Sequence, residues 1–210
     1  MAISLKLTDS SKTIENKIKK AIAEELNKIV RKRRAKVLGL AKKAVDGWVS
    51  SSPFFASLVS GGVASIAAEF GITAGNELSV ANVIQSAIVD STNIEVGKFT
   101  RTLKGGLQIR FQPSNFFNLL ALPEGFSVTE KGTNLHWMDW LINKGDQIIV
   151  FDYDFQPGLE GRSGGGVMIG GGAYRVNPRY AGVQDNNVFT DMFIGREKDV
   201  SKIIEDGLFG

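Results

Sequence analysis

"TIENKIKKAIAEELNKIVRKRRAKVLGLAKKAVDGW", residues 13–48, decides the fold of this chain, because apolar residues recur in it every three or four positions. That spacing predicts one helix with a continuous apolar stripe. Polar residues that can cap the first turn precede the stretch, and Gly47 followed by Ser-Ser-Ser-Pro marks its end. The stripe consists of Ile14, Ile18, Ile22, Leu26, Ile29, Val37, Leu40, Ala44 and Trp48.

This helix is longer than a single small domain needs, since at 1.5 Å per residue it would approach roughly 50 Å. We therefore expect either a break at Gly39 or a helix that extends beyond its own subunit.

Charge is distributed unevenly along the 210 residues. The first 50 contain thirteen Lys or Arg and five acidic residues, net +8, whereas the other 160 contain twelve and seventeen, net −5. Within the basic run, Arg31, Arg33 and Arg34 spread around the helical wheel. Four lysines share about one quadrant and are candidates to contact DNA or an acidic neighbour: Lys28, Lys32, Lys36 and Lys43. A solvated or inter-subunit salt-bridging helix is favoured over nucleic-acid contact, and a membrane-surface role is a third alternative.

The remaining pattern predicts an α+β fold. Residues 53–90 read as shorter helices, and alternation in 94–96 and 107–111 around "LKGG" predicts an antiparallel hairpin. We expect a mainly helical region, 1–90, with the long basic helix, and an α+β body, 91–210, with an antiparallel sheet and a C-terminal helix. Together they would form one compact domain.

A tryptophan-containing helix precedes the best strand of the chain, residues 147–155. Asn134 would cap "LHWMDWLINKG" and Gly145 would end it. We expect Trp137 and Trp140 to pack in the core or at an interface, and take them as candidate interface aromatics. The last helix would begin at a cap provided by Asp185 or Asn186.

"GRSGGGVMIGGGAY", residues 161–174, contains seven glycines. A hydrolase elbow is disfavoured, because glycines rather than a helix follow Ser163 and the only histidine, His136, precedes it. The phosphate-loop spacings are absent. We expect a flexible loop over 157–173 that orders on assembly, with candidate assembly residues Arg162, Ser163, Val167, Met168 and Ile169.

Catalytic and metal constellations are weak. Asp152 and Asp154 could share a cation, but they fit a strand that emerges into water. His136 and Asp139 are two candidate ligands where a catalytic zinc usually has three. The chain has no cysteine, which excludes disulfides and thiolate sites and fits synthesis in a reducing cytoplasm. Its start lacks the pattern of a secretory leader, and its apolar runs are too short for a membrane helix. We expect no catalysis, no metal, no cofactor and no membrane.

Three segments carry a family resemblance: "LHWMDWLINKGDQIIVFDYDF" (135–155), "GRSGG" (161–165) and "NPRYAGVQDNNVFTDMF" (177–193). In order and spacing, and with the long charged helix before them, they resemble virion structural proteins of tailed bacteriophages. The plan is similar to that of the neck or tail-completion proteins at the head-tail joint. The glycine-rich "GGGVMIGGG" departs from that pattern.

The resemblance implies a ring-forming component, without catalysis, that joins head to tail around the DNA channel. Its expected partners are copies of itself, the adjacent neck and tail proteins on the portal (connector) and tail-terminator sides, and, as a further candidate, the DNA in the channel. Its expected location is the virion, after synthesis in the host cytoplasm. Another tail or baseplate component, and a small nucleic-acid-binding protein that uses the basic helix, stay open as alternatives.

Overall fold

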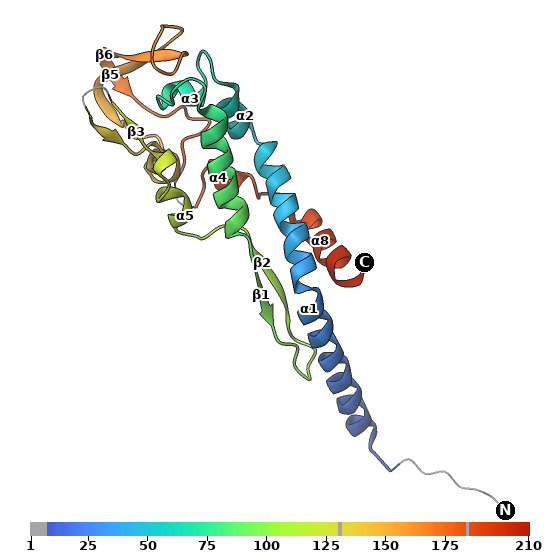
Figure 1. Ribbon diagram of the computed structural model, residues 1–210. Coiled ribbons are helices and arrows are strands. Elements are labelled where there is room, and N and C mark those ends of the chain that lie inside the picture. Colours follow the sequence, from blue (N-terminus) through green and yellow to red (C-terminus); the bar gives the residue numbers. More distant parts are fainter. Residues whose placement is uncertain (1–7, 130–131, 184) are drawn as a thin grey trace, which may run out of the picture.

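The computed structural model describes residues 8–129, 132–183 and 185–210 and has the predicted α+β composition (Figure 1). Half of the chain is helical. The helices are α1 (Ser11–Ser50), α2 (Pro53–Ser60), α3 (Ile66–Glu69), α4 (Glu77–Ser91), α5 (Phe117–Leu120), η1 (Pro123–Gly125), α6 (Trp137–Asp139), η2 (Trp140–Lys144), α7 (Val188–Asp191) and α8 (Glu197–Phe209). The strands are β1 (Asn93–Gly97), β2 (Gly106–Arg110), β3 (Ser127–Val128), β4 (Asn134–Leu135), β5 (Val150–Pro157) and β6 (Gly166–Tyr174).

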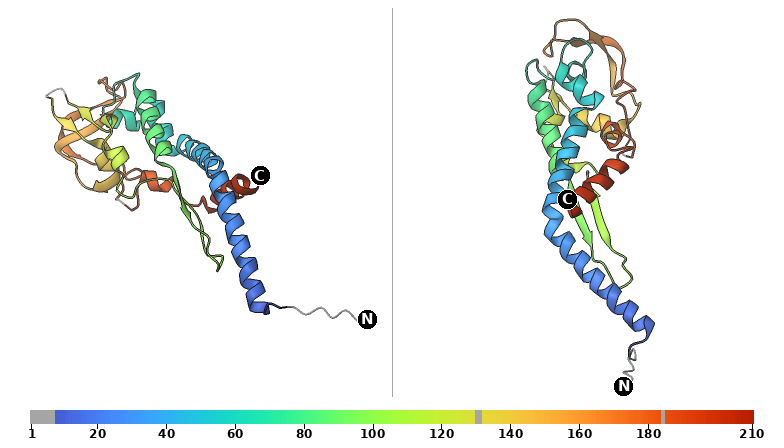
Figure 2. Two further views of the ribbon diagram at one scale, coloured as in Figure 1. Left: turned by 60° about the horizontal axis from the view of Figure 1, so that its bottom comes forward. Right: turned by 90° about the vertical axis from the view of Figure 1, so that its right-hand side faces the viewer.

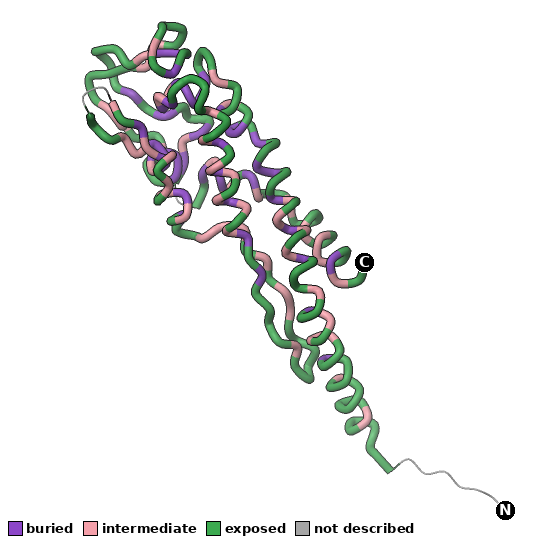
Figure 3. The backbone as a smooth tube through the Cα atoms, in the orientation of Figure 1, coloured by how far each residue is buried: buried purple, intermediate pink, exposed green. Residues whose placement is uncertain are grey.

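Helix α1 confirms the long helix and runs without a break through Gly39. Its 40 residues correspond to about 60 Å. The Ser10 hydroxyl caps the first turn by accepting a hydrogen bond from the Thr13 amide at 3.3 Å. Most of its buried residues lie in the second half, next to the core, while the first half extends into solvent (Figures 1 and 3). Among the described helices, none is both long enough and apolar enough to cross a membrane.

The core lies at the end of the molecule away from the start of α1. It is rich in aromatic residues: Phe54 packs edge-on against Phe189, with ring centroids 5.3 Å apart, and Phe70 stacks on Trp137 at 4.9 Å. One cluster of buried residues joins α1, α2 and α4 to the segments after Ser91, so the helical region and the α+β body share a core.

The strands form three separate antiparallel pairs in the described residues instead of the single sheet expected. β1 pairs with β2 from Asn93 opposite Arg110 to Gly97 opposite Gly106, as the alternation predicted. β3 pairs with β4, and β5 pairs with β6 with a bulge between Phe151 and Tyr153. Helical segments separate the pairs along the chain.

Two helix boundaries differ from the expectation. Asn134 lies in β4 rather than at a cap, and the tryptophan helix consists only of α6 and one π-helical turn, η2, before Gly145. The C-terminal segment is two helices, because Gly195 at φ +76° separates α7 from α8. Neither Asp185 nor Asn186 caps it; the Asn187 side chain accepts from the Phe189 and Thr190 amides. α8 packs across the middle of α1 (Figure 2).

Candidate assembly surfaces

The first half of α1 and the β1–β2 hairpin extend together beyond the core, and we call residues 11–34 and 93–110 the projecting arm (Figures 1 and 2). Asn27 joins its two parts. Its side chain accepts a hydrogen bond from the Phe99 amide at 2.9 Å and donates one to the Phe99 carbonyl at 3.0 Å. Arg34 donates to the carbonyl of Ile94 at 2.9 Å. The hairpin is thereby fixed beside the helix.

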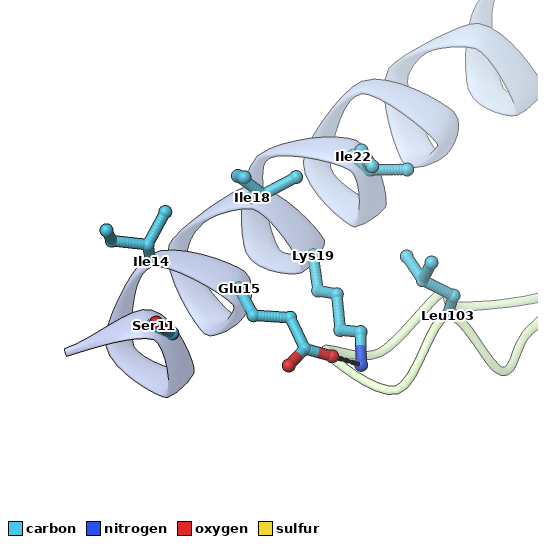
Figure 4. Close-up of a pocket in the computed structure, with 7 residues that line it drawn as sticks. All are labelled: Ser11, Ile14, Glu15, Ile18, Lys19, Ile22 and Leu103. Carbon is cyan, nitrogen blue, oxygen red and sulfur yellow. Dashed lines mark hydrogen bonds and ion pairs between the residues drawn. The ribbon is translucent and has the colours of Figure 1, made fainter.

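An open groove of about 460 Å³ lies at the end of this arm, lined by apolar side chains of α1 and of the hairpin turn (Figure 4). Ile18 and Ile22 are 54% and 42% exposed, and Leu103 lies opposite them. Glu15 and Lys19 form an ion pair at the rim, and hydrogen bonding to Lys19 lowers the pKa of Glu15. Clustered exposed aliphatic residues of this kind mark interaction sites.

The four predicted lysines, Lys28, Lys32, Lys36 and Lys43, are all exposed on α1. From Leu26 to Val45 the chain has eight Lys or Arg and no acidic residue. Lys28 pairs with Glu25 at 3.3 Å, whereas Lys32, Lys36 and Lys43 have no ion pair among the described residues. We call the exposed lysines together with Ile14, Ile18 and Ile22 the arm face.

These lysines and isoleucines lie on one side of the helix. Lys32 follows Ile14, and Lys36 follows Ile18, by 18 residues, which is five turns of an α-helix. The buried positions Val30, Val37 and Ala41 are well away from that direction on the wheel. The expected stripe therefore divides: Val37 and Trp48 of its second half are buried, whereas Ile18 and Ile22 of its first half are exposed.

The glycine segment is not the flexible loop that we expected, since most of it is strand β6. The true connection of the hairpin is 158–165, and it is docked. Arg162 donates to the carbonyls of Val128 and, at 2.8 Å, of Gly71, and its own carbonyl accepts from the Ala74 amide at 3.2 Å. Gly165 lies so close to Gly62 that a Cβ would be 2.0 Å from the Gly62 carbonyl oxygen. Close backbone approach explains this glycine better than flexibility does.

The candidate assembly residues of this segment consequently separate. Ser163 is buried and donates to the carbonyl of Gly166 at 3.3 Å, and Arg162 is occupied with backbone carbonyls, so neither is free for a partner. Val167 is half-buried and lines a cavity. Met168 and Ile169 are exposed, but on a strand instead of a loop tip.

Apolar and acidic side chains are interleaved on the outside of the β5–β6 hairpin. Phe151 is 69% exposed. Asp152, Asp154 and Glu160 are exposed and make no ion pair within the part of the chain that the structure describes. The ladder places Ile169 opposite Asp154 on this outer side, whereas Tyr153 and Met168 line the cavity beneath the hairpin. We call Phe151, Asp152, Asp154 and Ile169, with Glu160 on the connection, the hairpin surface.

The tryptophans are core residues, which corrects their assignment as interface aromatics. Trp137 is fully buried, and Trp140 is 9% exposed and packs edge-on against Phe70 and Tyr174. Their helix leads into β5, so packing on that strand was the interpretation that the sequence order favoured.

A half-buried carboxyl group beneath the β5–β6 hairpin was not predicted from the sequence. Glu69 lines a cavity of about 600 Å³, and its Oε2 and the hydroxyl of Tyr174 make no hydrogen bond. Burial raises the pKa of Glu69 to about 7, against a lowering influence of the neighbouring Tyr174. Burial, and then Glu69 itself, raise the pKa of Tyr174. Glu69 was missed because it lies in a four-residue helix, α3, that is far along the chain from Tyr174 in β6. Only the folded structure brings the two side chains together.

The candidate catalytic and metal residues are not assembled into a site. His136 stacks on Phe126 with ring centroids 4.0 Å apart, while Ser163 bonds its own loop. Asp152 occupies the β-bulge at φ +63°, which interrupts the strand alternation assumed for Asp152 and Asp154. Among the described residues, no three His, Cys, Asp or Glu side chains are grouped to hold a metal ion.

Comparisons of the chain with protein-family models, curated proteins and solved structures found no match in any of the three. The two surfaces are therefore interpreted from their own geometry and charge.

Proposed function

We propose that this chain is a structural virion protein of a tailed bacteriophage that forms a ring at the neck, around the DNA channel, without catalysing a reaction. The sequence resemblance described above supplies the phage context. The neighbours would be proteins on the portal side and on the tail-terminator side of the joint.

The projecting arm is the observation that carries this proposal. A single chain gains little from holding Ile18 and Ile22 in water on a helix that extends past its own core. Paired with a neighbouring subunit, the same residues would bury apolar surface. Ring contacts require two different complementary patches, and the arm and the β5–β6 end of this chain differ in charge.

The test is the molar mass of the purified protein by light scattering, together with negative-stain microscopy. We expect a discrete closed oligomer with a central opening. Ile18→Gln combined with Ile22→Gln should shift the mass toward the monomer, while Lys12→Gln combined with Asn16→Gln, on another side of the same turns, should not. A monomer at every concentration, absent from purified particles, would contradict the proposal.

Two alternatives remain distinguishable. The first is another tail or baseplate component. If electron cryomicroscopy of the particle places the chain in the tail tube or baseplate, the virion role is supported and the position at the neck is refuted. The second alternative, a nucleic-acid-binding protein, is favoured by the eight basic residues between Leu26 and Val45. It predicts salt-dependent duplex binding by the isolated monomer that is lost on charge reversal of Lys28, Lys32, Lys36 and Lys43.

A further inference from the structure

The molecule has two mixed surfaces, one along the exposed side of α1 and the other on the β5–β6 hairpin, which lies at the end of the molecule away from the start of α1 (Figure 1). The arm face combines aliphatic side chains with Lys32, Lys36 and Lys43. The hairpin surface combines aromatic and aliphatic side chains with Asp152, Asp154 and Glu160. Neither set of charges has an ion-pair partner within the described residues, so a counter-charge from another chain would complement each.

The apolar parts are matched as well as the charges. Ile18 is 54% exposed at one end, and Phe151 is 69% exposed at the other. The β5–β6 pair has no third strand among the described residues, and two-stranded hairpins gain stability from packing against a helix. Helix α1 offers such a partner, with Lys32 and Lys36 on the same side as its isoleucines and five turns further along the axis.

We propose that the arm face of one copy docks on the hairpin surface of the next copy, in a head-to-tail contact that repeats around the oligomer. This inference rests on the proposed ring and specifies its interface. In it, Lys32 and Lys36 meet Asp154 and Glu160, while Ile14, Ile18 and Ile22 cover Phe151 and Ile169. The two ends are too far apart to meet within one chain, so the contact is heterologous.

The isoleucines favour a protein occupant over DNA. A phosphate backbone attracts lysines through charge alone, and it offers no apolar surface that would bury Ile14 and Ile18. Because these side chains follow the same side of α1 as Lys32 and Lys36, a partner that uses the whole face must be both acidic and apolar. The hairpin surface has that composition.

A charge exchange tests the contact directly. Lys32→Glu with Lys36→Glu on the arm face, or Asp154→Lys with Glu160→Lys on the hairpin surface, should each weaken self-association at least about tenfold. All four substitutions in one chain, or a one-to-one mixture of the two double variants, should restore it. Circular dichroism confirms that each variant is folded. Neutral controls are Lys12→Gln and Glu205→Gln, which lie outside both surfaces.

Cross-linking provides a second measurement that needs no charge change, since the chain contains no cysteine. A mixture of Lys36→Cys and Asp154→Cys proteins should form a disulfide-linked heterodimer under mild oxidation, whereas each alone should not. Cross-linking of either variant to itself would show a two-fold contact and overturn the proposal.

The outcomes separate this inference from the proposed function. An oligomer whose mass the charge variants do not change keeps the ring and refutes the interface. Failure of the four-substitution chain to assemble also refutes it. If arm reversal removes binding to a fluorescent 30-base-pair duplex but leaves the oligomer intact, the arm face is a DNA surface. A wild-type chain that is always monomeric refutes both proposals.

Discussion

Glu69 shows how one side chain couples this fold to pH. Its carboxyl group lies beside Tyr174 beneath the β5–β6 hairpin, and burial raises its pKa from 4.5 to about 7. A raised carboxyl pKa means that the folded chain holds the proton more tightly than the unfolded chain. The free energy of unfolding should therefore fall as the pH rises from about 4.5 through about 7, and the penalty is fully present above that range.

Replacement of Glu69 by Gln should remove this dependence, because the amide keeps the shape and cannot ionise. We expect the free energy of unfolding of Glu69→Gln to exceed that of wild type by about 1–2 kcal/mol at pH 8, a value reduced for partial solvent exposure. At pH 4.5 the two proteins should differ little. Denaturant unfolding at the two pH values measures it. The exposed Glu205→Gln serves as control, and an equal effect of both substitutions would contradict the assignment.

Two helical glycines illustrate packing at the level of elements. Gly207 of α8 faces α1, where an added Cβ would lie 2.5 Å from Val37 Cγ2 and 3.1 Å from Val37 Cα. A Cβ added at Gly39 would have no neighbouring atom within 4 Å. The first glycine permits the close approach of α8 to α1, and the second only loosens α1.

Opposite responses to alanine are expected at the two positions. Gly207→Ala should lower the free energy of unfolding by about 1–3 kcal/mol, since it overpacks the α1–α8 contact. Gly39→Ala should raise it by about 0.5–1 kcal/mol through helix propensity. Thermal and denaturant unfolding check both. Stabilisation by Gly207→Ala would show that α8 adjusts its position without cost.

The attachment of the β1–β2 hairpin is an element-scale property that depends on Asn27. Asn27→Ala removes both of its hydrogen bonds to the backbone of Phe99. We expect faster hydrogen exchange of the Phe99 amide and of the neighbouring hairpin amides, and a loss of about 1–2 kcal/mol. Unchanged exchange at Phe99 would mean that Arg34 alone holds the hairpin; Asn16→Ala, on the free part of α1, is the matched control.

For the whole molecule, charge polarity predicts how assembly responds to salt. If oppositely charged ends meet, raising NaCl from about 50 mM to about 500 mM should slow association and shift the mass toward smaller species. Stopped-flow light scattering measures the rate. Association that strengthens with salt would indicate a purely apolar contact.

Sequence periodicity predicted the elements whose signal is local. The helix 13–48, the hairpin around "LKGG" and the α+β class are confirmed, because repeats of 3.6 and 2 residues are properties of short segments. The capping and glycine signals were less reliable. Asn134 pairs in a strand, and Gly165 is needed where two backbones meet, and neither fact is visible in neighbouring residues.

The sequence by itself determined the long helix α1, the first hairpin and the +8/−5 division of charge, since each depends on residue types and spacing alone. Only the tertiary structure decided that the apolar stripe of α1 divides into a buried and an exposed half. It also placed Trp137 in the core, bound Arg162 to the carbonyls of Val128 and Gly71, and half-buried Glu69 beside Tyr174. The physical reason is that burial depends on which distant segment covers a side chain, and a pattern along one helix does not specify its cover.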